Sequence, residues 1–421
     1  MPASLKCAII VNLSFYILFL ISKRITAALH RTEQSGGILM GARHYSFFAV
    51  ISLIAVLSAC ATFDQGAIGD GPDGSFNDHE DVKGLLDSDD TVESTSPSSE
   101  KVDTEIANES DTEIADSDST SDIPQNDYDY HPRDPGPFGI EKQEIIIDNE
   151  DATFYLPTDA GAIADGPFPL VIVHAGFRVG HGMYSHFSEH FTSHGFVVVG
   201  IEMPGVDDNH QANANHTIAV IDWLLSTQNP HVNIIDKKHI ATAGHSLGGK
   251  IAIYAAALDS RISNVIAWDP VDTGGPPCQI DPVGCKRWSV TPEMMGDVSA
   301  NLLIMGGMTG TGLFTCTPEG ESHHSYFEET TPSALHLDFP HSDHMDWMRD
   351  GGKTLIGLLG NLICGSLGST SFEDVHRIAN QTQVAWLLKY AKNHTGLDEY
   401  LDGSALDKDI NQGTVVVTYH P

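Results

Sequence analysis

The chain has 421 residues, with 22 Lys and Arg against 57 Asp and Glu, and its formal net charge is −35. This length suits two average domains, or one large domain with extensions. A charge so negative repels phosphate backbones, which argues against nucleic acid as a partner.

Two apolar runs, residues 8–21 and 47–57, come first in the chain. Both are shorter than the roughly 20 apolar residues that a membrane-spanning helix needs. The second has a basic start and ends in small residues, which is typical of a signal peptide. Its end, Leu-Ser-Ala-Cys at 57–60, resembles the lipobox of bacterial lipoproteins. That resemblance implies cleavage before Cys60, lipidation of Cys60, and an exported protein held at the cell envelope.

Met40 stands where such a signal peptide begins. Residues 40–60 are then the signal peptide, and residues 1–39 are an upstream extension that the cell does not make. In the alternative interpretation, residues 8–21 are a membrane segment in their own right.

Residues 61–135 carry 22 acidic against 3 basic side chains and few large apolar ones. Such a segment cannot bury enough apolar surface to offset its chain entropy, so we expect a disordered, extended spacer. Calcium binding is the alternative, but no loop with the spacing of calcium ligands stands out. A lipid at Cys60 and this spacer would tether a catalytic domain that spans residues 136–421.

Strand-like and helix-like runs alternate from residue 136 onward. This alternation predicts a mostly parallel sheet with helices on both faces, and active residues just beyond the carboxyl ends of the strands. We expect strands at 144–147, 153–156, 170–174, 196–201, 239–243, 265–268, 301–305 and 334–339, and helices at 184–194, 213–226, 250–258 and 383–393.

The motif Gly-x-Ser-x-Gly at 244–248 lies between an expected strand and an expected helix. A serine on such a turn has its hydroxyl pushed out of the sheet, which indicates a serine hydrolase with Ser246 as nucleophile. Gly244 and Gly248 would leave room for the tight turn. The backbone N–H of Leu247, and that of Phe177 after an earlier strand, are the expected oxyanion-hole donors.

A serine nucleophile needs a histidine base, which a carboxylate orients, and in this sheet type the chain order is Ser, acid, His. Asp269 directly follows a strand and is the favoured acid, while Asp272 is the alternative. His341 and His344 both follow the last strand, and either imidazole suits a general base.

A metal site at His341, His344 and nearby aspartates would leave the serine turn unexplained. His245 is expected to hydrogen-bond within the turn. The remaining histidines singled out are expected on the surface or on helix faces: His181, His186, His190, His194, His323 and His324.

Four cysteines lie in residues 136–421, and an even count in an exported chain suggests two disulfides. Of the three possible pairings, Cys278 with Cys285 closes a small loop and leaves Cys316 with Cys364. A zinc site made of the four is the weaker alternative, because they contain no Cys-x-x-Cys pair.

Six segments of the sequence resemble the chlorophyllase-like branch of the α/β-hydrolases, close to the cutinases. They are residues 170–177, 193–199, 244–250, 269–271, 316–320 and 344–346. The resemblance implies the α/β-hydrolase fold and a triad of Ser246, Asp269 and His344. The chain departs from the family pattern at Leu247, where arginine is usual, and at Asp343, where glycine is usual.

The sequence therefore predicts an exported serine esterase that forms an acyl-enzyme intermediate and needs neither a metal nor an organic cofactor. Its expected substrate is a small-molecule or lipophilic ester, and the chain is expected to be a monomer. The alternatives are an acyltransferase or a peptidase that uses the same triad, and a non-catalytic surface binding module.

Overall fold

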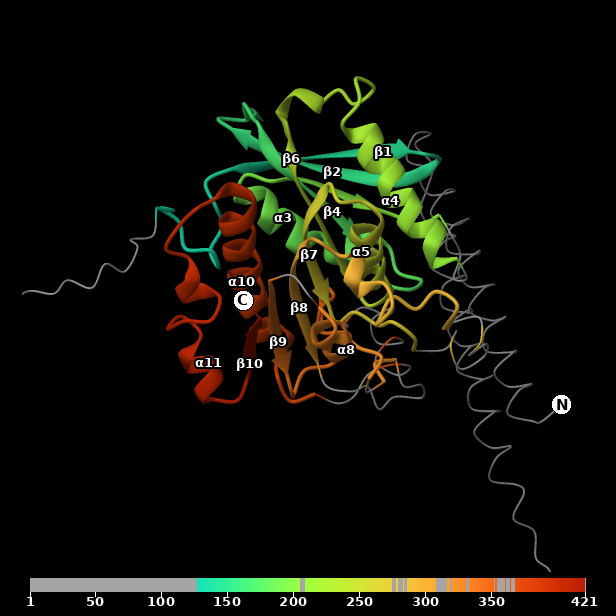
Figure 1. The fold of residues 1–421 in the computed structure, drawn as a ribbon. Coiled ribbons are helices and arrows are strands. Elements are labelled where there is room, and N and C mark those ends of the chain that lie inside the picture. Colours follow the sequence, from blue (N-terminus) through green and yellow to red (C-terminus); the bar gives the residue numbers. More distant parts are fainter. Residues whose placement is uncertain are drawn as a thin grey trace, which may run out of the picture. The chain divides into compact units, whose positions relative to one another are not determined.

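One mixed sheet runs through the domain (Figure 1). The structure, a computed structural model, describes residues 127–420 except 205–208, 275–277, 279–282, 284–285, 308–315, 319, 331–332, 352, 354–359, 361–363 and 365–367. The predicted extension, the signal peptide with Cys60 and nearly all of the linker lie outside the described residues.

The sheet has the strand order β1-β2-β5-β4-β6-β7-β8-β9-β10, with β3 beside β2. Strands β4 to β9 are parallel to one another, whereas β1, β2, β3 and β10 pair antiparallel at the two sides. The strands are β1 (Gly139–Ile147), β2 (Glu150–Asp159), β3 (Ala162–Ile163), β4 (Phe168–His174), β5 (Val197–Ile201), β6 (Ile235–His245), β7 (Ile262–Trp268), β8 (Asn301–Gly307), β9 (Ala334–Phe339) and β10 (Val416–His420).

Helices cover both faces of the sheet. Side chains alternate along β4, so Leu170 and Ile172 pack on one face while Val171 and Val173 pack on the other. Helices α4, α5 and α8 cover the first face, and α3 and α10 cover the second. The helices are α3 (Ser185–Ser193), α4 (His210–Leu224), α5 (Leu247–Leu258), α8 (His323–Glu328), α10 (Phe372–Lys392) and α11 (Asp407–Asn411), with short 3₁₀ turns η2 (His181–Tyr184), η3 (Val232–Ile234), η4 (Met295–Asp297) and η5 (Asp398–Tyr400).

The predicted layers are confirmed: a mostly parallel sheet lies between two layers of helices. The strand order reverses at β4, which lies between β5 and β6. In open sheets of this kind, ligands bind beyond the carboxyl ends of the strands at such a reversal. The loop after β4 and the turn after β6 meet at this point.

The elements near the C-terminus differ from the prediction, which did not include helix α11. Helix α10 begins at Phe372, eleven residues before the expected start at 383, because Ser371 caps it by accepting a hydrogen bond from the N–H of Asp374. Strand β10 was not expected at all. It lies at the edge of the sheet with Val416 and Tyr419 exposed, so it lacks a regular apolar alternation.

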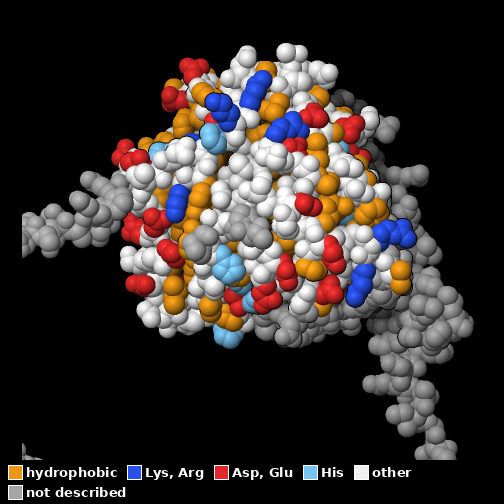
Figure 2. Space-filling view, viewed as in Figure 1, with side chains coloured by type: hydrophobic (Ala, Val, Ile, Leu, Met, Phe, Trp, Pro, Cys, Tyr) orange, Lys and Arg blue, Asp and Glu red, His pale blue; other side chains and the backbone are white. Residues whose placement is uncertain are grey.

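The last residues of the predicted linker contact the domain. Asp127 accepts hydrogen bonds from the N–H of Thr395 and from His394, and the Tyr128 hydroxyl lies 2.7 Å from His194 Nδ1. Acidic side chains are spread over the face shown in Figure 2, with fewer Lys and Arg among them. Within the part of the chain that the structure describes, no helix combines the length and the apolar content needed to cross a membrane.

Candidate active site

Ser246 lies where β6 turns into α5, with an uncommon backbone conformation (φ 56°, ψ −120°). Such a conformation costs about 1–3 kcal/mol and persists only where neighbouring groups impose it. A Cβ on Gly244 would collide with the backbone of Gly248, and a Cβ on Gly248 would collide with the carbonyl of Ala175. The turn therefore requires both glycines, and it leaves the Ser246 side chain partly exposed at the carboxyl end of the sheet.

Asp269 follows the last residue of β7 and is fully buried, also with positive φ (43°). Its N–H donates to the carbonyl of Met305 (2.6 Å), and its Oδ1 accepts from the N–H of Gly307 (3.2 Å), so the end of β8 holds it in place. Burial raises the pKa of the Asp269 carboxyl, but the adjacent His344 outweighs burial and the pKa falls below its usual value. Asp269 is therefore a carboxylate at neutral pH.

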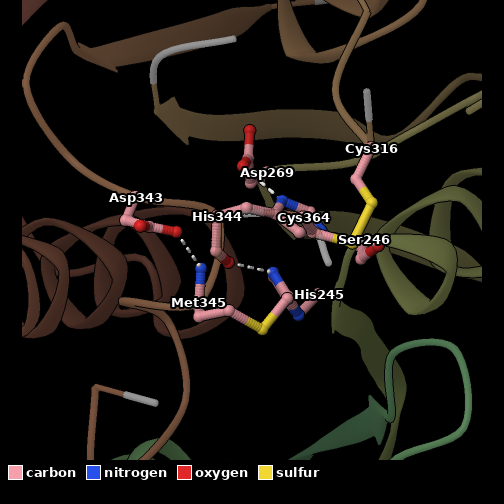
Figure 3. The surroundings of a disulfide bond; sticks show 8 residues. All are labelled: His245, Ser246, Asp269, Cys316, Asp343, His344, Met345 and Cys364. Carbon is pink, nitrogen blue, oxygen red and sulfur yellow. Dashed lines mark hydrogen bonds and ion pairs between the residues drawn. A yellow bond between two sulfur atoms is a disulfide. The ribbon is translucent and has the colours of Figure 1, made fainter. Parts of the chain in front are cut away.

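His344 lies on the turn after β9 and connects the other two side chains. Its Nδ1 donates to Asp269 Oδ2 (2.6 Å), and its Nε2 lies 3.0 Å from Ser246 Oγ. Because the carboxylate can only accept, Nδ1 carries the proton and Nε2 is free to accept from the serine hydroxyl. The three side chains come from residues 246, 269 and 344, and they form one hydrogen-bonded chain (Figure 3).

His245 and Tyr184 hold the backbone of His344 in place through two successive hydrogen bonds. His245 Nε2 donates to the carbonyl of His344 (2.8 Å), which leaves Nδ1 to accept from the Tyr184 hydroxyl (2.8 Å). Burial lowers the pKa of His245 well below its usual value, so this imidazole stays neutral. The sequence predicted a hydrogen-bonding role for His245, but it did not single out Tyr184, which lies 61 residues earlier.

The two expected oxyanion-hole residues lie on the elements that meet at the strand reversal. Leu247 is the first residue of α5, so its N–H has no acceptor within the helix. Phe177 lies three residues beyond β4, on the loop whose Ala175 carbonyl lies against Gly248. Their role as oxyanion donors stays a prediction.

Comparison with known proteins places this geometry in a family. The profile of the chlorophyllase family matches residues 151–406, more than half of the chain. The chain belongs to the chlorophyllase family. Chlorophyllase-2 of Arabidopsis thaliana is 27% identical over 221 residues, 49% of this chain and 68% of that protein. Chlorophyllase-1 of the same plant is 27% identical over 249 residues (54% and 72%), and Cutinase est1 of Thermobifida alba is 30% identical over 122 residues (27% and 38%).

The predicted family resemblance and the α/β-hydrolase fold are thereby confirmed. The names of the relatives support an ester hydrolase of the α/β-hydrolase type. Three parts of the matched region in this chlorophyllase-family chain also bear on alternatives that the sequence left open: the second aspartate, the second histidine and the cysteines.

Asp272, the alternative acid, faces a different partner. Its Oδ1 lies 3.2 Å from Nζ of Lys250, and both side chains are fully buried. The same carboxylate accepts from the N–H of Val290 (2.8 Å), from the Tyr326 hydroxyl (3.1 Å) and from Ser289. Asp272 therefore anchors the loop after β7 to helix α5, and it leaves Asp269 as the carboxylate that faces His344.

We expect Lys250→Met to lower the free energy of unfolding by about 3–5 kcal/mol, because it leaves the buried Asp272 charge without its cation. The double variant Lys250→Met with Asp272→Asn should regain part of that loss, since it removes the orphaned charge. Urea unfolding of the four proteins of this cycle measures both effects. A single-variant loss below about 1 kcal/mol would show that the pair is not buried as described.

His341, the alternative base, is exposed on the turn after β9, and its backbone carbonyl accepts from the N–H of Thr370. His344 occupies the position next to Ser246. Three of the histidines expected on the surface or on helix faces are buried, so they do not face solvent. His181, His194 and His323 are all buried, at 8%, 1% and 1% exposure.

A disulfide joins Cys316 to Cys364, two residues that are 48 positions apart. Figure 3 shows it beside Ser246 and His344. It links the segment after β8 to the segment that follows the His344 turn. The other predicted pair includes Cys285, which lies outside the described residues.

Asp346 belongs to the His344-Met345-Asp346 motif and supports the same turn. Its Oδ2 accepts from the N–H of Asp343 (2.7 Å), and Asp343 Oδ1 accepts from the N–H of Met345 (3.1 Å). Burial, with the nearby acidic groups, raises the pKa of Asp346 to about 7 from a usual value of 3.8. The native state therefore keeps a proton at pH 5–6 that the unfolded chain has released.

This difference fixes the sign of a pH effect. A raised native pKa means that stability falls as pH rises from about 4 to about 7, and that the loss is complete above pH 7. We expect Asp346→Asn to be more stable than the wild type at pH 8, by up to about 4 kcal/mol. The gain should vanish near pH 4. Urea unfolding at both pH values tests this, and an equal difference at the two would contradict it.

Proposed function

We propose that this chlorophyllase-family chain is an exported hydrolase of carboxylic esters. Ser246 acts as the nucleophile, His344 as general base and then general acid, and Asp269 as the carboxylate that orients His344. The observation that carries the proposal is the hydrogen-bonded chain from Asp269 Oδ2 through His344 to Ser246 Oγ, with steps of 2.6 and 3.0 Å. Proton transfer from a serine hydroxyl to a base requires that the base lie within hydrogen-bond distance of the hydroxyl and that a third group orient the base in the same way.

The first half of the reaction forms an acyl-enzyme. Ser246 Oγ attacks the ester carbonyl carbon while its proton passes to His344 Nε2, and the negative charge that develops on the carbonyl oxygen is held by the N–H groups of Leu247 and Phe177. Asp269 stabilises the imidazolium that forms. When the tetrahedral intermediate collapses, the alcohol departs with the proton from His344.

The second half returns the enzyme to its starting state. A water molecule gives a proton to His344 Nε2 and attacks the acyl carbon, and Ser246 leaves as the proton returns to its oxygen. Each oxyanion donor would contribute about 3 kcal/mol of transition-state stabilisation. Leu247, which is apolar and 9% exposed beside Ser246, supports a lipophilic acyl or alcohol group in the substrate.

Hydrolysis of p-nitrophenyl esters with short and long acyl chains tests the reaction class, alongside peptides and with added alcohol acceptors. We expect ester hydrolysis, with long acyl chains accepted. Faster cleavage of peptides would indicate a peptidase, and acyl transfer to the alcohol exceeding release of the acid would indicate an acyltransferase. Either result would overturn the ester-hydrolase proposal.

We also propose that lipid on Cys60 tethers the enzyme at the cell envelope through the acidic segment 61–135. The Leu-Ser-Ala-Cys run at 57–60 supports this, and so does the disulfide between Cys316 and Cys364, because such bonds persist in oxidising compartments. Mass spectrometry of the mature protein tests the proposal. We expect a chain that begins at a lipid-modified Cys60, and an unmodified chain that begins at Met1 would contradict it.

A further inference from the structure

Three histidines lie together near the active site, and one of them, His323, lies 4.0 Å from Asp269 Oδ1. His323 and His324 begin helix α8, and His336 lies in the middle of β9. One ring nitrogen from each lies within 4.8 Å of one from the other two. In the described part of the chain, no other group of three or more His, Cys, Asp or Glu side chains comes together in this way.

The two buried members face each other directly. His323 Nδ1 lies 2.8 Å from His336 Nε2. His323 Nε2 donates to the carbonyl of Gly307 (2.9 Å), and because a carbonyl only accepts, this bond leaves the lone pair of His323 on Nδ1, toward His336. The ring of His323 also lies so close to the Cα atom of Gly306 that a side chain there would collide with it. The end of β8 is therefore shaped around this imidazole.

A metal ligand of this kind needs an unprotonated imidazole whose other ring nitrogen is held by a hydrogen bond, as the Gly307 carbonyl holds His323. The Nδ1 atom of His323 meets this requirement, and His336 Nε2 lies 2.8 Å from it. Imidazole is the side chain that suits zinc, copper and nickel, whereas magnesium and calcium prefer oxygen.

We propose that His323, His324 and His336 bind one divalent transition-metal ion of the zinc, copper or nickel class. The ion would take the place of the hydrogen bond between His323 Nδ1 and His336 Nε2, and the His336 ring would then carry its proton on Nδ1. Because Zn–N bonds are 2.0–2.1 Å, tetrahedral ligation places two nitrogens about 3.3 Å apart. The 2.8 Å pair must therefore open by about half an ångström.

The outer side of the cluster is open to solvent at His324 and carries a carboxylate, that of Asp338. The His324 side chain is 49% exposed, and its Nε2 lies 3.7 Å from Asp338 Oδ2. Asp338 is two residues after His336 on β9, so the two side chains leave the same face of the sheet. The Asp338 carboxylate lies beside His324 but outside the group of atoms within 4.8 Å of one another, so it would have to move toward the three nitrogens to supply the fourth ligand that zinc takes.

The proposed site lies next to the active site, but it takes no part in the reaction. His323 Nε2 is 4.0 Å from Asp269 Oδ1, and Gly307 connects the two, since its carbonyl accepts from His323 while its N–H donates to Asp269. An ion held by α8 and β9 would fix the β8 terminus that positions Asp269. Metal binding is measured without any substrate, so its failure is distinct from a failure of the proposed esterase function.

The test is isothermal titration calorimetry of the full chain, treated with chelator and then titrated with zinc chloride. We expect about one ion per chain with micromolar or tighter affinity, together with a higher Tm when zinc is added. His324→Gln should weaken binding at least about tenfold. Because His324 is half exposed, this variant should fold normally, whereas His336→Gln tests the buried ligand and needs a matching fold control.

His341→Gln is the matched control, because His341 is also an exposed histidine that comes shortly after a strand end. It should leave the Kd for zinc unchanged. Absence of zinc binding by the folded wild type would overturn the proposal. Binding with the same Kd in wild type, His324→Gln and His336→Gln would place the ion elsewhere and would overturn it equally.

Discussion

Replacing Ser246 with alanine is expected to lower kcat for ester hydrolysis by about 10⁵- to 10⁶-fold, because it removes the atom that forms the acyl-enzyme. Substrate binding should change little, since the hydroxyl contributes mainly at the reacting carbon. A small residual rate above that of water is expected from the oxyanion donors alone. Steady-state kinetics on a p-nitrophenyl ester measures kcat and KM separately.

The control for this variant is its stability. Ser246 Oγ makes a 3.0 Å contact with His344, and the backbone of the turn is held by Gly244 and Gly248, so alanine should keep the fold. The Tm of Ser246→Ala should lie close to that of the wild type. A folded variant that retained more than about a tenth of the wild-type kcat would exclude Ser246 as the nucleophile.

The two histidines after β9 should differ sharply when each is replaced by alanine. His344→Ala is expected to lower kcat by about 10⁵- to 10⁶-fold, because Ser246 loses the group that takes its proton. His341→Ala should change kcat by no more than about twofold, since its side chain is exposed and a surface substitution costs little. Parallel kinetics of the two variants measure the contrast.

This pair of variants tests the base rather than the fold. His344 is 2% exposed, so part of the effect of His344→Ala could come from repacking, and the Tm of both variants must be compared. Equal losses of kcat at the two positions would refute the assignment of His344. A loss of kcat in His341→Ala alone would identify His341, on the exposed side of the turn, as the base.

The central part of the fold could be predicted because its signals are local. Continuous apolar runs such as Leu170–Val173 indicate strands that are buried on both faces, and the structure has β4 there. The glycines around Ser246 indicate a sharp turn for the same steric reason that the structure shows. Asp269 could be singled out because it directly follows a strand, the position at which parallel sheets present their functional side chains.

The parts of the fold and of the site that the sequence did not predict depend on contacts between distant residues. Strand β10 forms only because it pairs with β9, and its exposed Val416 and Tyr419 give no clear period. Tyr184 supports His344 through His245, a connection that three separate segments make together. The choice between His341 and His344 rested on a family resemblance, because both follow the same strand and their sequence context is similar.

The buried histidines were missed for a related reason. An imidazole tolerates both surface and core, so His323 could be placed only once the end of β8 and the start of α8 were seen to meet. The Gly306-Gly307 pair was the available signal, because two glycines at a strand end leave room for a neighbouring ring. The pairing of Asp272 with Lys250, 22 residues earlier, could not be predicted either, because it also depends on a contact between separate segments.

Labelling of the full chain with a fluorophosphonate probe tests the central claim most directly, because the probe phosphonylates only a serine that a neighbouring base has activated. We predict one probe per chain, located by mass spectrometry on the peptide that contains Ser246. Labelling should be lost in Ser246→Ala and strongly slowed in His344→Ala. Absence of labelling in the folded wild type, or undiminished labelling of Ser246→Ala, would contradict the assignment of Ser246 as an activated nucleophile.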